Sequence, residues 1–116
     1  MAHKDLVGSW GETFAAEWVM SNGCEVLARN VRTQACEVDL VFVESGVLVI
    51  GEVKTRTSTR AGCAAEAIDA TRIKRLRSAA MLLAREYPTF RNVRVDAITI
   101  DLVDGVISLR HLRGIE

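Results

Sequence analysis

The run from Val47 to Thr55 constrains the fold of this chain more than any other segment. Its sequence begins Val-Leu-Val-Ile-Gly-Glu-Val-Lys, and is almost wholly apolar before the charged residues begin. A strand of this kind is usually buried on both faces, which places it in the centre of its sheet. Ser45-Gly46 precedes it and can turn it back on the run Glu37–Val43, which is rich in β-branched residues. We therefore expect these two strands to form a hairpin.

Helical and strand patterns continue on both sides of this hairpin. The expected elements, in chain order, are a helix at 9–20, strands at 24–32, 37–43 and 47–55, a helix at 64–87, and strands at 93–102 and 106–112. Pro88 ends the second helix, and Asp104-Gly105 can turn the last two strands. The order αβββαββ predicts an α/β fold, a mixed sheet flanked by two helices. No linker or repeat divides the 116 residues, so we expect one domain over residues 1–116.

Composition limits the class of function. Lys and Arg together number 15, as do Asp and Glu, and a net charge of zero argues against a protein that coats nucleic acid through bulk charge. The three cysteines have no metal-ligand spacing, so neither a disulfide framework nor a structural zinc site is expected. No apolar run approaches the roughly 20 residues of a membrane span, and the N-terminus has no signal-peptide pattern. We expect a cytoplasmic protein with no membrane partner.

Acidic residues interrupt both strands of the predicted hairpin. Alternation along a strand places Asp39 on the same face as Glu37, and Glu52 on the same face as Lys54. The hairpin would bring Asp39 close to Glu52, where two carboxylates inside an apolar sheet repel each other and lose hydration. A divalent cation removes that cost. Oxygen ligands without well-placed Cys or His favour Mg²⁺ or Mn²⁺ over zinc.

Lys54 adds a positive charge beside this expected metal site. A lysine there can orient the nucleophile or stabilise charge that develops on phosphorus, while the metal activates water. The arrangement is therefore typical of metal-assisted phosphodiester hydrolysis. The alternative is a buried ion pair, Glu52–Lys54 or Asp39–Lys54, that only sets strand register. The strand charges alone do not decide between these two interpretations.

The chain also carries a set of short motifs in a fixed order. They are Gly11-Glu12-x-x-Ala15, Arg29-Asn30-x-Arg32, Cys36-Glu37-Val38-Asp39-Leu40, Gly51-Glu52-Val53-Lys54-Thr55-Arg56, Ala65-Glu66-Ala67-Ile68-Asp69-Ala70 and Val93-Arg94-Val95-Asp96. As a set, over nearly the whole chain, they resemble the YraN family of bacterial proteins, often described as predicted endonucleases. That family is similar to archaeal Holliday-junction resolvases of the PD-(D/E)xK nuclease superfamily. The resemblance implies a restriction-endonuclease-like fold.

The resemblance also implies roles for individual residues. Asp39 matches the motif aspartate of the superfamily, Glu52 and Lys54 match its (D/E)xK pair, and Glu12 matches an acidic residue supplied by the first helix. Asp39, Glu52 and Glu12 are thus the expected metal ligands and, with Lys54, the expected catalytic residues. Glu37 is interpreted as a supporting residue or a solvated one.

Three positions depart from the family pattern. Cys36 stands where the family usually has Gly, Gly51 where it usually has Val, and Arg72 (or Lys74 by a small shift) where it has Lys. None of these changes removes an expected ligand.

A basic tract follows the predicted catalytic lysine. The segment from Lys54 to Arg77 contains seven basic and two acidic residues, a local excess of five positive charges in an otherwise neutral chain. The residues expected to grip nucleic-acid phosphates are Arg56, Arg60, Arg72, Lys74 and Arg75. The alternative is a solvated helix face. Trp10 and Trp18 are expected in the core, and the lone strand histidine His111 is not expected to be catalytic.

These observations together predict an endonuclease that acts on nucleic acid, specifically branched or irregular DNA, with Mg²⁺ or Mn²⁺ as cofactor. By analogy with the resolvases, we expect a homodimer. Two functions of other classes stay open, a nucleic-acid-binding module without turnover and a structural or assembly protein of the same fold.

Overall fold

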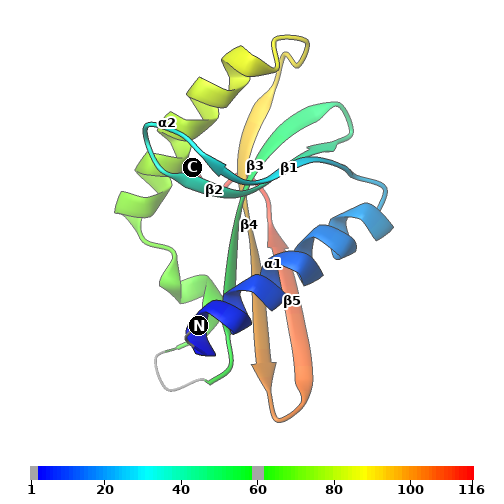
Figure 1. Ribbon diagram of the computed structural model, residues 1–116, viewed down its shortest axis with the longest axis vertical. Coiled ribbons are helices and arrows are strands. Elements are labelled where there is room, and N and C mark those ends of the chain that lie inside the picture. Colours follow the sequence, from blue (N-terminus) through cyan, green and yellow to red (C-terminus); the bar gives the residue numbers. More distant parts are fainter. Residues whose placement is uncertain (1–2, 59–61) are drawn as a thin grey trace.

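A sheet with strand order β1-β2-β3-β4-β5 forms the centre of the computed structural model, which describes residues 3–58 and 62–116 (Figure 1). The elements are α1 (His3–Ser21), β1 (Glu25–Arg32), β2 (Glu37–Glu44), β3 (Val47–Arg56), the short 3₁₀ helix η1 (Ala64–Ala67), α2 (Ala70–Glu86), β4 (Val93–Val103) and β5 (Val106–Leu112). Strand β3 is parallel to β4, and all other neighbouring strands are antiparallel. The predicted mixed sheet and its αβββαββ order are confirmed, and they are consistent with a restriction-endonuclease-like fold.

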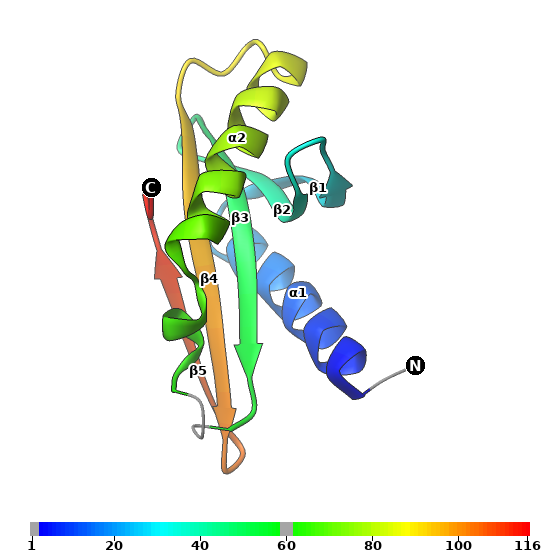
Figure 2. The same ribbon diagram turned by 90° about the vertical axis from the view of Figure 1, so that its left-hand side faces the viewer.

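The central position predicted for β3 is also confirmed. Leu48, Val49 and Ile50 are fully buried, because helices cover both faces of the sheet. Helix α1 packs on one face through residues such as Val19, and α2 packs on the other through residues such as Leu76 (Figures 1 and 2). No helix within residues 3–58 and 62–116 is both long and apolar enough to cross a membrane.

The second predicted helix differs from the observed one. The segment expected to be one helix at 64–87 is divided into η1 and α2 by an extended backbone at Ile68 and Asp69. Asp69 is the N-cap of α2, where its side chain accepts a hydrogen bond of 2.8 Å from the backbone N–H of Arg72. An aspartate at this position satisfies one of the free N–H groups of a first helical turn, so it favours a helix start over helix continuation.

The first helix is longer than predicted, and one aromatic residue on it is misplaced by the sequence analysis. Helix α1 begins at His3 rather than near residue 9. Its buried stripe follows Gly11, Ala15 and Val19, and Trp10 lies beside that stripe with 39% of its surface exposed. The expectation that Trp10 is a core residue was therefore wrong, although its ring lies 5.3 Å from that of Phe14.

Strands β2 and β3 separate before either of them ends. Their ladder runs from Glu44 opposite Val47 to Leu40 opposite Gly51, whereas β3 remains paired with β4 as far as Arg56. Figure 2 shows β1 and β2 bending away from β3 and β4. Asp39 and Glu52 would form the next cross-strand pair, so they lie where the two strands part. This separation opens the end of β3 to side chains from both helices.

Gly11 allows α1 to approach the end of β3 closely. A methyl group placed on Gly11 would lie only 1.9 Å from Oγ1 of Thr55, so no larger residue fits without a shift. The contact brings the next residue, Glu12, to the place where β2 and β3 separate.

We expect Gly11→Ala to lower the free energy of unfolding by about 1–3 kcal/mol, because overpacking forces α1 away from β3. Gly8→Ala is the matched control, since the same change in the same helix meets no atom within 4 Å. It should raise the free energy of unfolding by about 0.5–1 kcal/mol through helix propensity alone. Urea unfolding measures both effects. Equal effects of the two substitutions would contradict a close contact between α1 and β3.

Candidate functional site

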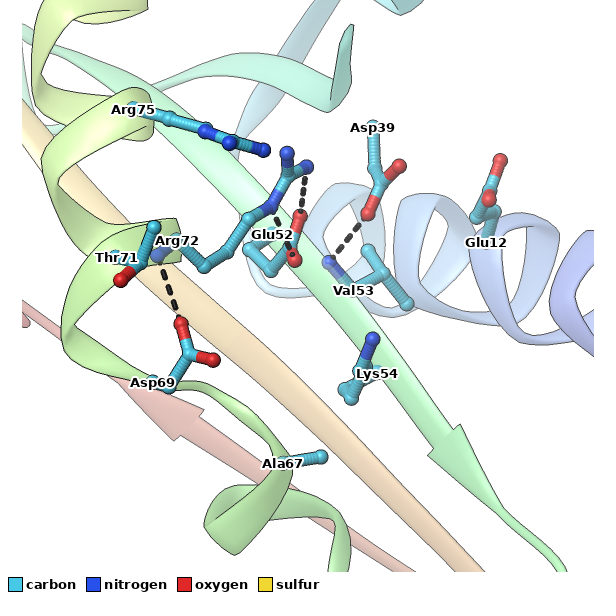
Figure 3. A pocket seen from close by; sticks show the side chains of 10 residues that line it. All are labelled: Glu12, Asp39, Glu52, Val53, Lys54, Ala67, Asp69, Thr71, Arg72 and Arg75. Carbon is cyan, nitrogen blue, oxygen red and sulfur yellow. Dashed lines mark hydrogen bonds and ion pairs between the residues drawn. The ribbon is translucent and has the colours of Figure 1, made fainter. Parts of the chain in front are cut away.

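A pocket of about 500 Å³ lies at the end of β3, between α1 and the first turns of α2 (Figure 3). Its lining residues are Glu12, Asp39, Glu52, Val53, Lys54, Ala67, Asp69, Thr71, Arg72 and Arg75. The four residues predicted as catalytic, which come from α1, β2 and β3, thus face one space. The walls are polar and charged, as expected for a site that handles an ionic substrate rather than an apolar ligand.

Asp39 occupies the position where β2 leaves β3. Its Oδ2 accepts a hydrogen bond of 2.8 Å from the backbone N–H of Val53, which takes the place of a ladder bond between the strands. Burial and the negative charges of Glu52 and Glu12 together raise the pKa of Asp39 to about 7, although the hydrogen bond from Val53 acts to lower it. The carboxylate form of Asp39 therefore lacks enough positive charge around it.

Glu52 is 4% exposed and is held by an arginine from the opposite helix. Arg72 donates from Nε to Oε2 and from Nη2 to Oε1, both at 2.8 Å, so the pair is bidentate. Nη2 of Arg72 also donates to the backbone carbonyl of Glu37 at 2.9 Å. The ion pair described for Glu52 is thus with Arg72, not with Lys54 as one interpretation of the sequence proposed.

Glu12 reaches the pocket from α1. Burial raises the pKa of Glu12, as do the charges of Glu37 and Glu52, while Arg29 opposes them. The carboxylate of Glu37 contacts Arg32 at 3.4 Å on the surface, so only its backbone contacts the pocket arginine.

The donor set of Asp39, Glu52 and Glu12 fits a hard divalent cation. Mg²⁺ commonly uses one or two carboxylates and completes its shell with water and substrate phosphate. Asp39 and Glu52 supply those carboxylates from neighbouring strands, and Glu12 supplies a further one. The Arg72 guanidinium on Glu52 shows that this carboxylate already accommodates a cation.

The predicted phosphate-binding residues divide into three groups. Arg72 and Arg75 lie on one side of α2 and line the pocket. The side chain of Lys54, which was predicted to be catalytic, points into the same space as that of Asp39 (Figure 3). Arg56 on β3 and the exposed Lys74 on α2 are not among the residues that line the pocket. Arg60 lies outside the described residues.

A second charged cluster on the α1 face of the sheet was missed by the sequence analysis. Within the described part of the chain, the possible ligand atoms of Glu44, Asp96 and His111 all lie within 4.8 Å of one another. The carboxylate oxygens of the three pocket residues do not form so close a group. His111 lies 2.7 Å from fully buried Asp96 through Nε2, and Arg94 contacts both acids at 2.6–2.8 Å. The one local signal was the alternation of Arg94 and Asp96, which share a face of β4.

This second cluster is built as an ion-pair network rather than an open metal site. Each carboxylate oxygen of Glu44 and Asp96 already accepts at least one hydrogen bond, from Arg94, Arg113, His111 or the backbone. Although burial acts to raise it, the bonds from His111 and Arg94 hold the pKa of Asp96 below its usual value. The network ties the segment after β5 to β4, where Gly114 donates to Asp96 at 3.0 Å.

The raised pKa of Asp39 predicts a pH-dependent stability in metal-free buffer. The folded state binds more protons than the unfolded state between pH 3.8 and about 7, so the free energy of unfolding falls as pH rises through that range. Asp39→Asn keeps an acceptor for Val53 but cannot ionise. It should be more stable than the parent at pH 8, by up to about 4 kcal/mol, and by much less at pH 5.

Urea unfolding at the two pH values, with a chelator present, measures this difference. Glu17→Gln on the exposed face of α1 is the control for the change in net charge. If Asp39→Asn raises the free energy of unfolding by the same amount at pH 5 and pH 8, protonation of Asp39 is not the cause of the difference.

Comparison with known proteins identifies the family of this chain. Residues 11–100 match uncharacterised protein family UPF0102, a span that contains every pocket residue. Similar proteins, each named a UPF0102 protein, occur in a Nocardioides species (41% identity, covering 98% of this chain and 94% of the relative) and in Beutenbergia cavernae (38%, covering 99% of both). Another occurs in Syntrophomonas wolfei (36%, covering 91% and 93%). The resemblance inferred from the sequence motifs is confirmed, and this chain belongs to the UPF0102 (YraN) family.

Proposed function

We propose that this protein is a divalent-metal-dependent endonuclease that hydrolyses nucleic-acid phosphodiesters. One observation carries the proposal: Asp39, Glu52 and Lys54 face a single pocket that is also lined by two arginines of α2. Carboxylates beside a lysine suit a metal and the reacting phosphate, and the arginines suit the charge of the backbone.

The electrostatics of the pocket support a cation as part of the working site. Three carboxylates, of Glu12, Asp39 and Glu52, line one pocket, and the pKa of both Glu12 and Asp39 is raised. When bound, Mg²⁺ or Mn²⁺ would act as a Lewis acid that lowers the pKa of water and neutralises a phosphate oxygen. Asp39 and Glu52 would hold the ion, with Glu12 as a third acidic group.

The remaining residues have distinct tasks in this proposal. The Val53 hydrogen bond at 2.8 Å keeps Asp39 oriented toward the pocket. The Lys54 ammonium either orients the attacking water or stabilises charge on the phosphate oxygens as it develops. Arg75, which is exposed at the pocket rim, holds a neighbouring phosphate of the strand.

The lining favours contacts to the backbone over contacts to bases. The residues that line the pocket include no aromatic side chain on which a base could stack. We propose branched or irregular DNA as the substrate and a homodimer as the acting form, both by the resemblance to resolvases.

Cleavage of a labelled panel of duplex, single-stranded, flap and four-way-junction DNA with Mg²⁺ or Mn²⁺ tests this function. Glu52→Gln and Lys54→Met should each lower the cleavage rate about 100-fold or more, because the first removes a proposed metal ligand and the second removes a positive charge beside the reacting phosphate. Arg85→Met, at the exposed far end of α2, is the matched control and should cleave like the parent.

The other outcomes separate the alternative functions. Salt-dependent DNA binding without cleavage, unchanged by Glu52→Gln, would favour a binding module without turnover. No affinity for any nucleic acid at low salt would favour a structural or assembly protein. Cleavage that persists in both variants would identify a contaminating nuclease.

A further inference from the structure

Arg72 occupies the carboxylate that the proposed function assigns to the metal. Its guanidinium spans both oxygens of Glu52 at 2.8 Å, and the bond from Nη2 to the carbonyl of Glu37 at 2.9 Å holds it in place. The Glu52 side chain is only 5% exposed, so little of it is left accessible beside the guanidinium. Figure 3 shows the Arg72 side chain extending from α2 across the pocket to reach Glu52.

A divalent cation and this guanidinium compete for the same oxygens. Ligation through Glu52 requires at least one oxygen that Arg72 now uses, and two cations held on one carboxylate at close range repel each other. Arg72 in this position therefore opposes metal binding to Glu52. In contrast, Asp39 makes no ion pair within residues 3–58 and 62–116, and its Oδ2 accepts the hydrogen bond from Val53.

Arg72 is placed so that its side chain can move while its backbone stays fixed. Its backbone N–H is anchored by Asp69 at 2.8 Å, in the first turn of α2, and its side chain is 28% exposed at the pocket. The hydrogen bonds described for the guanidinium use Nε and Nη2 and none uses Nη1, which leaves donors for an incoming group. A phosphate can replace Glu52 as a bidentate partner, because guanidinium matches both groups equally well in shape.

We propose that Arg72 is an internal cation that keeps the metal from Glu52 until a nucleic-acid phosphate draws it away. This inference rests on the proposed function of the same pocket. Nucleic acid and metal then bind cooperatively, and by linkage each raises the affinity for the other. The site acquires its metal together with its substrate. Arg72 thus has two partners in sequence, Glu52 first and phosphate afterwards.

Calorimetric titration with Mn²⁺ in the absence of nucleic acid tests the first half of this proposal. Arg72→Met should bind Mn²⁺ about 10-fold more tightly than the parent, because Glu52 is no longer occupied. Arg75→Met is the matched control, since it removes the same charge from the same pocket but leaves Glu52 paired. Its affinity should stay within about threefold of the parent, because an exposed charge is largely screened.

Arg72→Lys serves as a second variant, because loss of a buried partner can unfold a protein. A lysine keeps the charge but cannot span both oxygens, so its Mn²⁺ affinity should lie between those of the parent and Arg72→Met. Thermal melting gives an independent measure. Saturating Mn²⁺ should raise the melting temperature of Arg72→Met more than that of the parent.

Fluorescence anisotropy of a labelled single-stranded oligonucleotide tests the second half, in a Lys54→Met background that slows turnover. Mn²⁺ should tighten oligonucleotide binding, and adding Arg72→Met should reduce that gain at least fivefold. If Mn²⁺ increases the oligonucleotide affinity by the same factor with and without Arg72, the proposed coupling is overturned.

Glu52→Gln separates failure of this inference from failure of the proposed function. Suppose that Glu52→Gln abolishes Mn²⁺ binding, whereas Arg72→Met leaves the Mn²⁺ affinity unchanged or lowers it. That result would overturn the role of Arg72 and keep the metal site. Equal tightening by Arg72→Met and Arg75→Met would also overturn it, because general charge would then be the cause. If Glu52→Gln removes no Mn²⁺ binding from the parent or from Arg72→Met, both the metal site and the role of Arg72 are excluded.

Discussion

The negative charge of Glu52, buried in the central strand, is the constraint on which the pocket depends. A carboxylate that is 4% exposed costs several kcal/mol unless a partner compensates it, and here the partner must come from another element. Arg72 serves this purpose from the first turn of α2, so the start of that helix must face the end of β3. The interruption between η1 and α2 at Asp69 meets that need. A continuous helix would lack the N-terminal turn from which Arg72 reaches Glu52.

A second requirement is that both sides of the sheet contribute to one pocket. The separation of β2 from β3 beyond Leu40 and Gly51 makes this possible, because it opens a gap between strands that would otherwise pair. Asp39 stabilises the gap by accepting the hydrogen bond of Val53. Helix α1 packs on the opposite face, yet its Glu12 lines the same pocket, since Gly11 lets the helix lie against Thr55. A glycine and an aspartate thus shape the pocket as much as its charged walls do.

Features with a local signal could be predicted from the sequence, and features that join distant segments could not. The central strand and the placement of Asp39 near Glu52 follow from an apolar run, an alternation of charge and a short turn. The break at Asp69 also had a local signal, a capping residue, but the helical pattern around it outweighed that signal. The partner of Glu52 lies 20 residues away on another element, and strand alternation suggested Lys54 instead. The contact of His111 with Asp96 lies within the predicted hairpin of the last two strands, but a turn signal does not show which side chains of the two strands form a hydrogen bond.

The two acidic clusters of this chain use the same chemistry and differ in how completely they are neutralised. On the α1 face, arginines, His111 and the backbone saturate Glu44 and Asp96, and accordingly the pKa of Glu44 falls to about 2 and that of Asp96 is also lowered. In the pocket, three carboxylates line one space, Arg72 pairs with Glu52, and the pKa of Asp39 rises to about 7. The more tightly clustered set is therefore neutralised by its own neighbours, whereas the looser one keeps a carboxylate, that of Asp39, with too little positive charge around it. The direction of the pKa shift, rather than the closeness of the carboxylates, shows which cluster its own neighbours neutralise.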